Sequence, residues 1–237
     1  KNNITLIPRA AGTSLAGQVV GNGMVVDISK HFNQMIEVNI EERWCRVQPG
    51  VIRDDLNHYL KGFGLMYGPE TSTANRAMIG GMVGNNSCGL HSIVWGSARD
   101  HLDMQPFNAA DSQFNLCKLL AGSEGTLAFI TELKLNLLPL PPKEVGMVVV
   151  HCTSLVESLY ANIEVLKQGP MASELVDKMI MDFTIGHPEY QKNRFFIEGD
   201  PAALLMVEFM DDSRQALEAK MKATIEALQA ASLGYAY

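Results

Sequence analysis

Residues 8–18 read PRAAGTSLAGQ, a stretch of small side chains with a single cation, Arg9. The apolar run of residues 4–7 just before it predicts a β-strand, so this stretch is expected to be the loop after that strand. Gly12 and Gly17 can adopt a positive φ, which lets successive backbone N–H groups point at one anion. The loop therefore predicts either a pyrophosphate cradle or a glycine-rich turn packed against a helix.

Two familiar phosphate-binding motifs are excluded at this loop. No Gly-Lys-Ser/Thr follows, so it is not a Walker A loop, and no third glycine follows Gly12 and Gly17 at the spacing of a dinucleotide fingerprint.

Length and composition limit the class of protein. The chain has 237 residues, 47% of them hydrophobic, which allows one large domain or two small ones. A net charge of −7 without a run of Lys or Arg argues against a nucleic-acid partner. No apolar stretch approaches the ~20 residues that a membrane-spanning helix needs.

Cysteine usage and the start of the chain add two expectations. Cys45, Cys88, Cys117 and Cys152 are far apart and form no CxxC pair, which indicates reduced thiols in a cytoplasmic protein and no metal site. No signal peptide precedes the first strand, and this abrupt start at Lys1 indicates a fragment.

The hydrophobic pattern predicts two domains separated by the proline-rich residues 139–142. We expect a first domain over residues 1–142 and a second over residues 143–237, a small α+β domain with helices on one face of a sheet. The expected strands are residues 4–7, 23–28, 34–38, 43–47, 127–131, 133–138, 145–150 and 202–209; the expected helices are 51–61, 154–167 (with Leu155, Leu159, Ile163 and Leu166 on one face), 173–185 and one after residues 211–213.

Three further stretches share the small, polar character of the opening loop. They read YGPETST (67–73), MIGGMVGNNSCG (78–89) and AGSEGTL (121–127). Together with PRAAGTSL they resemble, in order, the signatures of FAD-binding domains of the vanillyl-alcohol oxidase / p-cresol methylhydroxylase (PCMH) superfamily. The branch most similar contains the D-lactate, glycolate and D-2-hydroxyglutarate dehydrogenases. VQPG (47–50) and WGSARD (95–100) extend the resemblance, which covers residues 4–138.

This resemblance implies an α+β fold: an FAD-binding PCMH-type domain of two α/β subdomains, followed by a truncated, ferredoxin-like α+β cap. The opening loop would hold the FAD pyrophosphate. Relatives with a covalent flavin at this loop carry a His where Thr13 stands, so the resemblance implies non-covalent FAD. The cofactor-binding residues that the matched motifs imply are Arg9, Ala10, Ala11, Gly12, Thr13, Ser14, Leu15, Pro69, Glu70, Thr71, Gly80, Gly81, Asn85, Asn86, Gly89, Glu124, Gly125 and Ile130.

The sequence departs from the family pattern at several points. Met78 replaces a Thr, and Cys88 occupies a glycine position, where we interpret it as a small space-filling residue rather than a redox group. The family's His-rich catalytic stretch is missing, so the catalytic His and Arg and any metal are expected outside this chain. The six histidines are scattered, and His91 is the one nearest the flavin-binding stretches. The jump after Leu102 predicts that residues 102 and 103 are not adjacent in the natural protein.

The activity that the resemblance implies is the oxidation of a small D-2-hydroxy acid of the lactate, glycolate or 2-hydroxyglutarate class, with hydride passing to FAD. No nicotinamide fingerprint is present, so electrons would leave through a partner, an iron–sulfur domain or a quinone pathway, which leaves peripheral association with the inner membrane open. The alternatives are a flavoenzyme of the same fold with another substrate, a non-catalytic flavin- or nucleotide-binding module, and a purely structural α+β domain.

Overall fold

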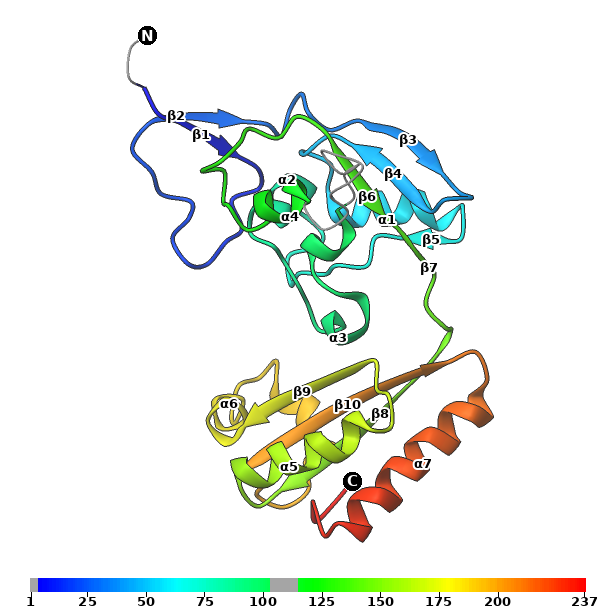
Figure 1. The fold of residues 1–237 in the computed structure, drawn as a ribbon. Coiled ribbons are helices and arrows are strands. Elements are labelled where there is room, and N and C mark those ends of the chain that lie inside the picture. The colour runs from blue at the N-terminus through cyan, green and yellow to red at the C-terminus, as the bar shows by residue number, and fades with distance from the viewer. Residues whose placement is uncertain (1–3, 103–114) are drawn as a thin grey trace. The chain divides into compact units, whose positions relative to one another are not determined.

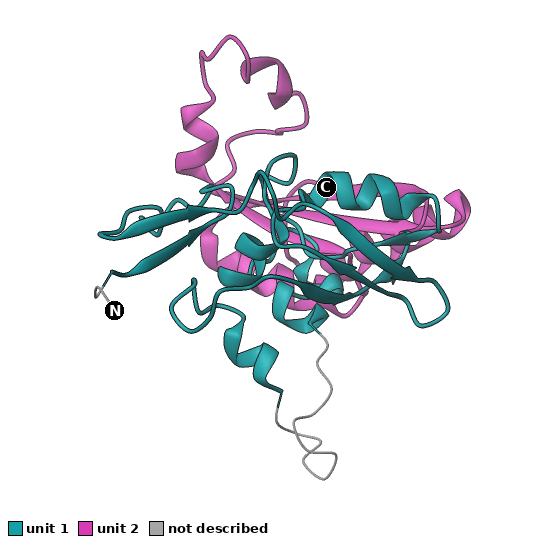
Figure 2. Cartoon of the chain, turned by 90° about the horizontal axis from the view of Figure 1, so that it is seen from above, with its two compact units in different colours: residues 1–140 teal, residues 141–237 magenta. Residues whose placement is uncertain are grey.

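A computed structural model describes residues 4–102 and 115–237 (Figure 1). The chain divides into two compact units, residues 1–140 (unit 1) and 141–237 (unit 2), which Figure 2 shows in different colours. Each unit has its own cluster of buried apolar side chains, so each is held together by its own core. The predicted break between residues 102 and 103 lies outside the described residues.

Unit 1 begins with a parallel pair of strands, β1 (Leu6–Arg9) and β2 (Met24–Asp27). Leu6 lies opposite Met24 and Arg9 lies opposite Asp27. Residues 10–23 connect the two strands without a helix. The predicted loop therefore follows a strand, but it begins at Ala10, because Pro8 and Arg9 are still part of β1.

An antiparallel sheet of three strands, in the order β3-β4-β6, follows in unit 1. Its first two strands confirm the strands predicted over residues 34–38 and 43–47, which pair as an antiparallel hairpin. The helix predicted over residues 51–61 is also present, and two short strands pair beside it. The elements are β3 (Met35–Asn39), β4 (Trp44–Val47), α1 (Arg53–Lys61), β5 (Leu65–Met66), β6 (Leu133–Asn136) and β7 (Leu138–Pro139).

The glycine-rich residues 68–99 are built from short helices rather than one long element. The apolar side chains of this run, Ile79, Met82 and Val83, are buried, so the run is anchored to the core despite its length. Residues 127–131, predicted as a strand, form no regular element in the structure, so that prediction is wrong. The helices are α2 (Ile79–Gly84), α3 (Ser92–Trp95), the 3₁₀ helix η1 (Ala98–His101) and α4 (Leu116–Leu120).

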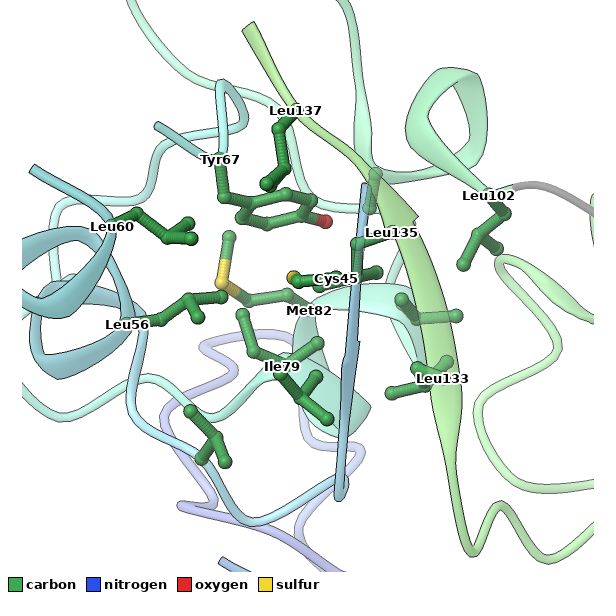
Figure 3. Close-up of a cluster of buried hydrophobic side chains, with 14 of the residues drawn as sticks. Cys45, Leu56, Leu60, Tyr67, Ile79, Met82, Leu102, Leu133, Leu135 and Leu137 are labelled. Carbon is green, nitrogen blue, oxygen red and sulfur yellow. The ribbon is translucent and has the colours of Figure 1, made fainter. Parts of the chain in front are cut away.

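The core of unit 1 joins the sheet to helices α1 and α2 (Figure 3). Leu56 and Leu60 of α1, Cys45 of β4 and Leu135 of β6 are fully buried there. Tyr67 lies among them with an exposed fraction of 0%. Burial of each large apolar side chain contributes about 1.5–3 kcal/mol, so this cluster anchors the segments that carry the glycine-rich stretches.

Unit 2 is an antiparallel sheet of three strands in the order β8-β10-β9. Helices α5 and α7 pack on the same face of it, where Ala161, Val165 and Leu217 meet Val207 and Phe209. The elements are β8 (Glu144–Cys152), α5 (Leu155–Leu166), β9 (Ala172–Asp177), α6 (Lys178–Phe183), η2 (Gln191–Arg194), β10 (Ala203–Asp211) and α7 (Arg214–Ala230).

One helix prediction in unit 2 is wrong in part. Residues 173–185 were expected to be helical throughout, but residues 172–177 form β9, the edge strand beside β10. Helix α6 begins only at Lys178, where the side chain of Asp177 accepts a hydrogen bond from the backbone N–H of Ile180. Hydrogen bonding to β10 makes the first half of this segment a strand. A strand depends on such a partner, which the local sequence does not show.

Helix α5 turns an unexpected face toward the sheet. Leu155, Leu159 and Ile163 from the predicted apolar stripe are half-exposed. Ser158 and Ala161, with Val165, are buried instead. Small side chains let the helix axis approach the sheet closely, and Ser158 satisfies its hydroxyl by donating to the carbonyl oxygen of Leu155 at 2.7 Å.

Candidate FAD-binding site

A cavity of about 560 Å³ lies in unit 1 and is lined by all four glycine-rich stretches. Its size falls within the ~300–1,000 Å³ typical of ligand sites. The predicted cofactor residues that line it are Arg9, Ala10, Ala11, Gly12, Thr13, Ser14, Leu15, Thr71, Gly80, Gly81, Asn85, Asn86, Glu124, Gly125 and Ile130.

The opening loop presents free backbone donors to this cavity. Among the hydrogen bonds of the described residues, the N–H groups of residues 11–15 donate to no protein acceptor. Gly12 has a φ of 65°, a left-handed conformation that glycine adopts without strain. Arg9 braces the loop, because its Nη2 donates to the carbonyl oxygen of Val19 at 2.6 Å. The loop is thus shaped as an anion cradle.

The turn at residues 121–125 closes the cavity from another side. The N–H of Glu124 donates to the carbonyl oxygen of Gly84 at 2.9 Å, which fastens the turn to the end of α2. A Cβ at Gly125 would lie 2.7 Å from Pro8, so only glycine fits against β1. Gln18 then links the turn to the opening loop, since its Nε2 donates to Glu124 Oε1 at 3.2 Å and its Oε1 accepts from the Ser14 hydroxyl.

Arg99, in the WGSARD turn, holds two of the lining stretches together. Its backbone N–H donates to Asn86 Oδ1 at 2.9 Å, and its Nη2 donates to the carbonyl oxygen of Ala121 at 2.8 Å. Asn86 and Glu124 both have positive φ, 49° and 52°, a strained conformation that non-glycine residues keep only where surrounding contacts impose it. Sequence reasoning matched the WGSARD motif but gave Arg99 no role in the site.

The carboxyl group of Asp100 supports the same turn. Its Oδ2 accepts hydrogen bonds from the backbone N–H and the hydroxyl of Ser97, both at 2.8 Å. The N–H of Ser97 is the main reason that the pKa of Asp100 is lowered from its usual value. The carboxylate is therefore the N3 partner in the capping box of η1, whose N-cap is Ser97 and which carries Arg99.

Three predicted cofactor residues do not line the cavity: Pro69, Glu70 and Gly89. The carbonyl oxygen of Pro69 accepts a hydrogen bond from Arg53 Nε at 3.1 Å, and Glu70 Oε2 lies 2.7 Å from His91 Nδ1. Gly89 packs against Glu70, because a Cβ at position 89 would lie 2.6 Å from Glu70 Cβ. All three sit just behind lining residues rather than among them.

The cavity also has lining residues that sequence reasoning did not assign. Met78 lines it at the position where the family carries Thr, and Cys88 lines it with an exposed side chain. Most of the others are sequence neighbours of the quoted motif residues. Their position beside the motifs is therefore the sequence feature that could have identified them as lining residues. The unassigned lining residues are Pro8, Gln18, Val19, Ile28, Pro49, Ser72, Thr73, Ala77, Met78, Met82, Gly84, Ser87, Cys88, Leu120, Ser123 and Ala128.

Residues 4–102 and 115–237 hold no group of three or more His, Cys, Asp and Glu side chains arranged to bind a metal ion. None of their helices combines the length and hydropathy needed to cross a membrane.

Comparison with known proteins extends these observations. Residues 1–107 match the family of FAD binding domains. The chain is 29% identical over 295 residues to D-2-hydroxyglutarate dehydrogenase of Pseudomonas putida, covering 95% of this chain and 29% of that protein. It is 29% identical to glycolate oxidase subunit GlcD of Bacillus subtilis, covering 84% of this chain and 47% of that protein.

The fold has a counterpart among solved structures. An alkyldihydroxyacetonephosphate synthase matches with a TM-score of 0.75 and 16% identity, over 96% of this chain and 46% of that one. The chain thus spans less than a third of the P. putida relative and about half of the other two proteins.

The fold and the cavity define an FAD-binding domain of the PCMH type, with FAD as its cofactor. More narrowly, the chain is similar to members of the FAD-linked oxidase branch, namely the D-2-hydroxyglutarate dehydrogenases, D-lactate dehydrogenase and GlcD. These findings confirm the resemblance carried by the glycine-rich stretches and the α+β fold class. The ferredoxin-like cap remains a prediction.

Proposed function

We propose that unit 1 binds FAD non-covalently in its cavity, and that the chain is the flavin-binding part of an oxidoreductase acting on a small D-2-hydroxy acid. The observation that carries this proposal is the opening loop: residues 11–15, whose N–H groups donate to no acceptor among the described residues, line the same cavity as the three later glycine-rich stretches.

The cavity suits a ligand with an anionic middle and a large flat ring. Its charged lining residues are Arg9 and Glu124, so the negative charge of a pyrophosphate would be met mainly by backbone N–H groups and Arg9. Glu124 is already engaged by Gln18, which holds that carboxylate in place beside the cradle. When bound, FAD supplies hydride acceptance, while these residues bind and orient it.

The non-covalent attachment rests on Thr13, which lines the cavity where a covalently flavinylated relative carries a His. Precipitating the protein with acid should release all FAD into the supernatant. FAD that stays with the precipitated protein would contradict this part of the proposal and would direct attention to Cys88, whose thiol lines the cavity.

FAD binding itself is tested by titrating the stripped protein with FAD and following flavin fluorescence. Gly12→Val should abolish binding, because it strains the loop at a φ of 65° and places a side chain in the cradle. Gly64→Val is the matched control: it imposes similar strain at a φ of 72° at the end of α1, away from the cavity. Equal loss of FAD binding in both variants would contradict the assignment of the opening loop as part of the FAD site.

The substrate class rests on the names of the relatives, which are D-2-hydroxyglutarate dehydrogenase, D-lactate dehydrogenase and a glycolate oxidase subunit. This chain is expected to lack the catalytic His and Arg, so the test uses the full-length gene product loaded with FAD: anaerobic mixing with each of these acids should bleach the visible absorbance of the flavin for one of them. FAD binding without bleaching by any acid would favour a non-catalytic flavin-binding module. In the proposed reaction, electrons pass from the reduced FAD to a partner protein or quinone. An artificial dye would replace that acceptor in the assay.

Two proposals concern the chain's organisation. We infer that residues 143–237 belong to a substrate-binding cap domain. We also infer that a segment is absent between residues 102 and 103. The alignment with the P. putida relative runs over 295 residues, more than the 237 of this chain, so that relative carries residues without a counterpart here. Sequencing the gene across this point tests the inference, and a codon for Leu102 followed directly by the codon for Asp103 would overturn it.

A further inference from the structure

A network of charged side chains lies directly behind the cavity wall, and the proposed function does not use it. It consists of Arg53, Glu70 and His91. Glu70 Oε2 lies 2.7 Å from His91 Nδ1, and Glu70 Oε1 lies 3.8 Å from Arg53 Nη2. The side chains of His91 and Glu70 are only 10% and 26% exposed, so water competes little for their contact.

The network starts from the rigid core. Arg53 is the first residue of α1, and its Nε donates to the carbonyl oxygen of Pro69 at 3.1 Å. Asn57, one turn further along α1, exchanges two hydrogen bonds with the backbone of Tyr67, at 2.7 and 3.1 Å. Helix α1 therefore fixes the course of residues 67–70 up to the carboxylate of Glu70.

Glu70 in turn contacts the segment of residues 89–95. His91 is held by the carboxylate and stacks on Trp95, with ring centroids 4.2 Å apart. Gly89 is packed so tightly beneath Glu70 that a Cβ would lie 2.6 Å from Glu70 Cβ and 3.1 Å from its backbone. The two segments thus touch through both the Glu70–His91 hydrogen bond and a close backbone approach.

Both contacts lie next to residues that line the cavity. Glu70 is followed by Thr71–Thr73, and Gly89 is preceded by Ser87 and Cys88. We propose that the Glu70–His91 pair is a positioning clamp that sets the distance between these two walls of the FAD cavity. The clamp rests on the proposed function for its role in cofactor binding, and on the geometry of the apoprotein for its existence.

Two histidine variants of similar polarity separate the clamp from a general structural role. In His91→Asn the amide nitrogen lies near the position of Nδ1 and can still donate to Glu70; in His91→Gln it lies near Nε2 and cannot. We expect His91→Gln to raise the Kd for FAD about tenfold, the size of one charge-assisted hydrogen bond, and His91→Asn to stay close to wild type. His58→Ala, an exposed histidine on α1, is the control and should change nothing.

A glycine substitution tests the close backbone approach while leaving the side chains of Glu70 and His91 unchanged. Gly89→Ala should spread the two segments and weaken FAD binding, because its methyl group meets Glu70. Gly62→Ala is matched, since its Cβ would make only an ordinary contact of 3.6 Å.

Hydrogen–deuterium exchange of the FAD-free protein provides the readout that does not depend on the cofactor. Faster exchange confined to residues 69–73 and 86–91 in His91→Gln and Gly89→Ala, with rescue in His91→Asn, supports the clamp. Unchanged exchange and FAD affinity overturn it, and so does a rise in exchange throughout unit 1, which would mark a purely structural pair. If the wild type binds no FAD but the local exchange pattern holds, the proposed function fails while the clamp stands.

Discussion

The Nη2 of Arg99 donates to the carbonyl oxygen of Ala121 at 2.8 Å, which joins the WGSARD turn to the loop that closes the FAD cavity. This bond reaches across 22 residues of sequence and accompanies the bond from the Arg99 N–H to Asn86 Oδ1. Arg99 thereby joins two stretches that line the cavity, one through its backbone N–H and one through its side chain, without lining the cavity itself.

Arg99→Met should therefore weaken FAD binding. The carbonyl of Ala121 loses its charged donor, so the 121–125 turn is free to move away from α2, and we expect the Kd for FAD to rise about tenfold or more. Fluorescence titration measures the change. Arg214→Met, an exposed arginine on α7 whose ion pairs are at the surface, should leave the Kd unaltered. An Arg99→Met protein that binds FAD like the wild type would refute the alignment role.

Tyr67→Phe should stabilise the protein. The hydroxyl of Tyr67 is fully buried and, within the described residues, has no hydrogen-bond partner, and this burial raises the pKa of the phenol. Removing an unsatisfied buried oxygen gains about 1 kcal/mol in the free energy of unfolding, visible as a higher Tm. Tyr59→Phe, half-exposed on α1, is the control and should be neutral. A lower Tm for Tyr67→Phe would mean that the hydroxyl has a partner in solution.

The four thiols should differ sharply in reactivity. Burial raises the pKa of Cys45 to about 12 and that of Cys152 to about 11, so neither forms much thiolate near neutral pH. Cys88 is exposed and lines the cavity, so it should be alkylated by iodoacetamide and be protected when FAD is bound. Mass spectrometry of labelled peptides measures each site. Labelling of Cys88 at the same rate with and without FAD would contradict the placement of the cofactor.

Asp100→Asn should lower stability in a pH-dependent way. Because the bonds from Ser97 lower the folded-state pKa of Asp100, its contribution is present above the unfolded-state value of about 3.9 and is lost as pH falls through the folded value. We expect the variant to lose about 1 kcal/mol near neutral pH, as for a removed helix cap, and the difference to vanish in acid. Denaturant unfolding across pH measures it; a gap that widens in acid would disprove the assignment.

The sequence was most informative where function depends on the backbone. The glycines of PRAAGTSLAGQ and AGSEGTL take positive φ, as loops that present N–H groups require, and both loops line one cavity. It was least informative about Glu70 and Gly89, which stand in a matched motif yet face Arg53, His91 and each other. A motif shows which segment approaches the cofactor but not which way each side chain turns within it.

The sequence by itself determined which four loops are built from small and glycine residues, because those residue types directly limit backbone conformation. The resemblance of these loops to a known family then indicated an FAD-binding domain. Only the tertiary structure decided how those loops meet. Gln18 and Glu124 are bonded although they lie 106 residues apart. Residues 172–177 form a strand because β10 lies beside them, and α5 buries Ser158 and Ala161 because small side chains allow close packing. Such contacts depend on partners that are far away in the sequence, and a local stretch of sequence does not show which partner will pack against it.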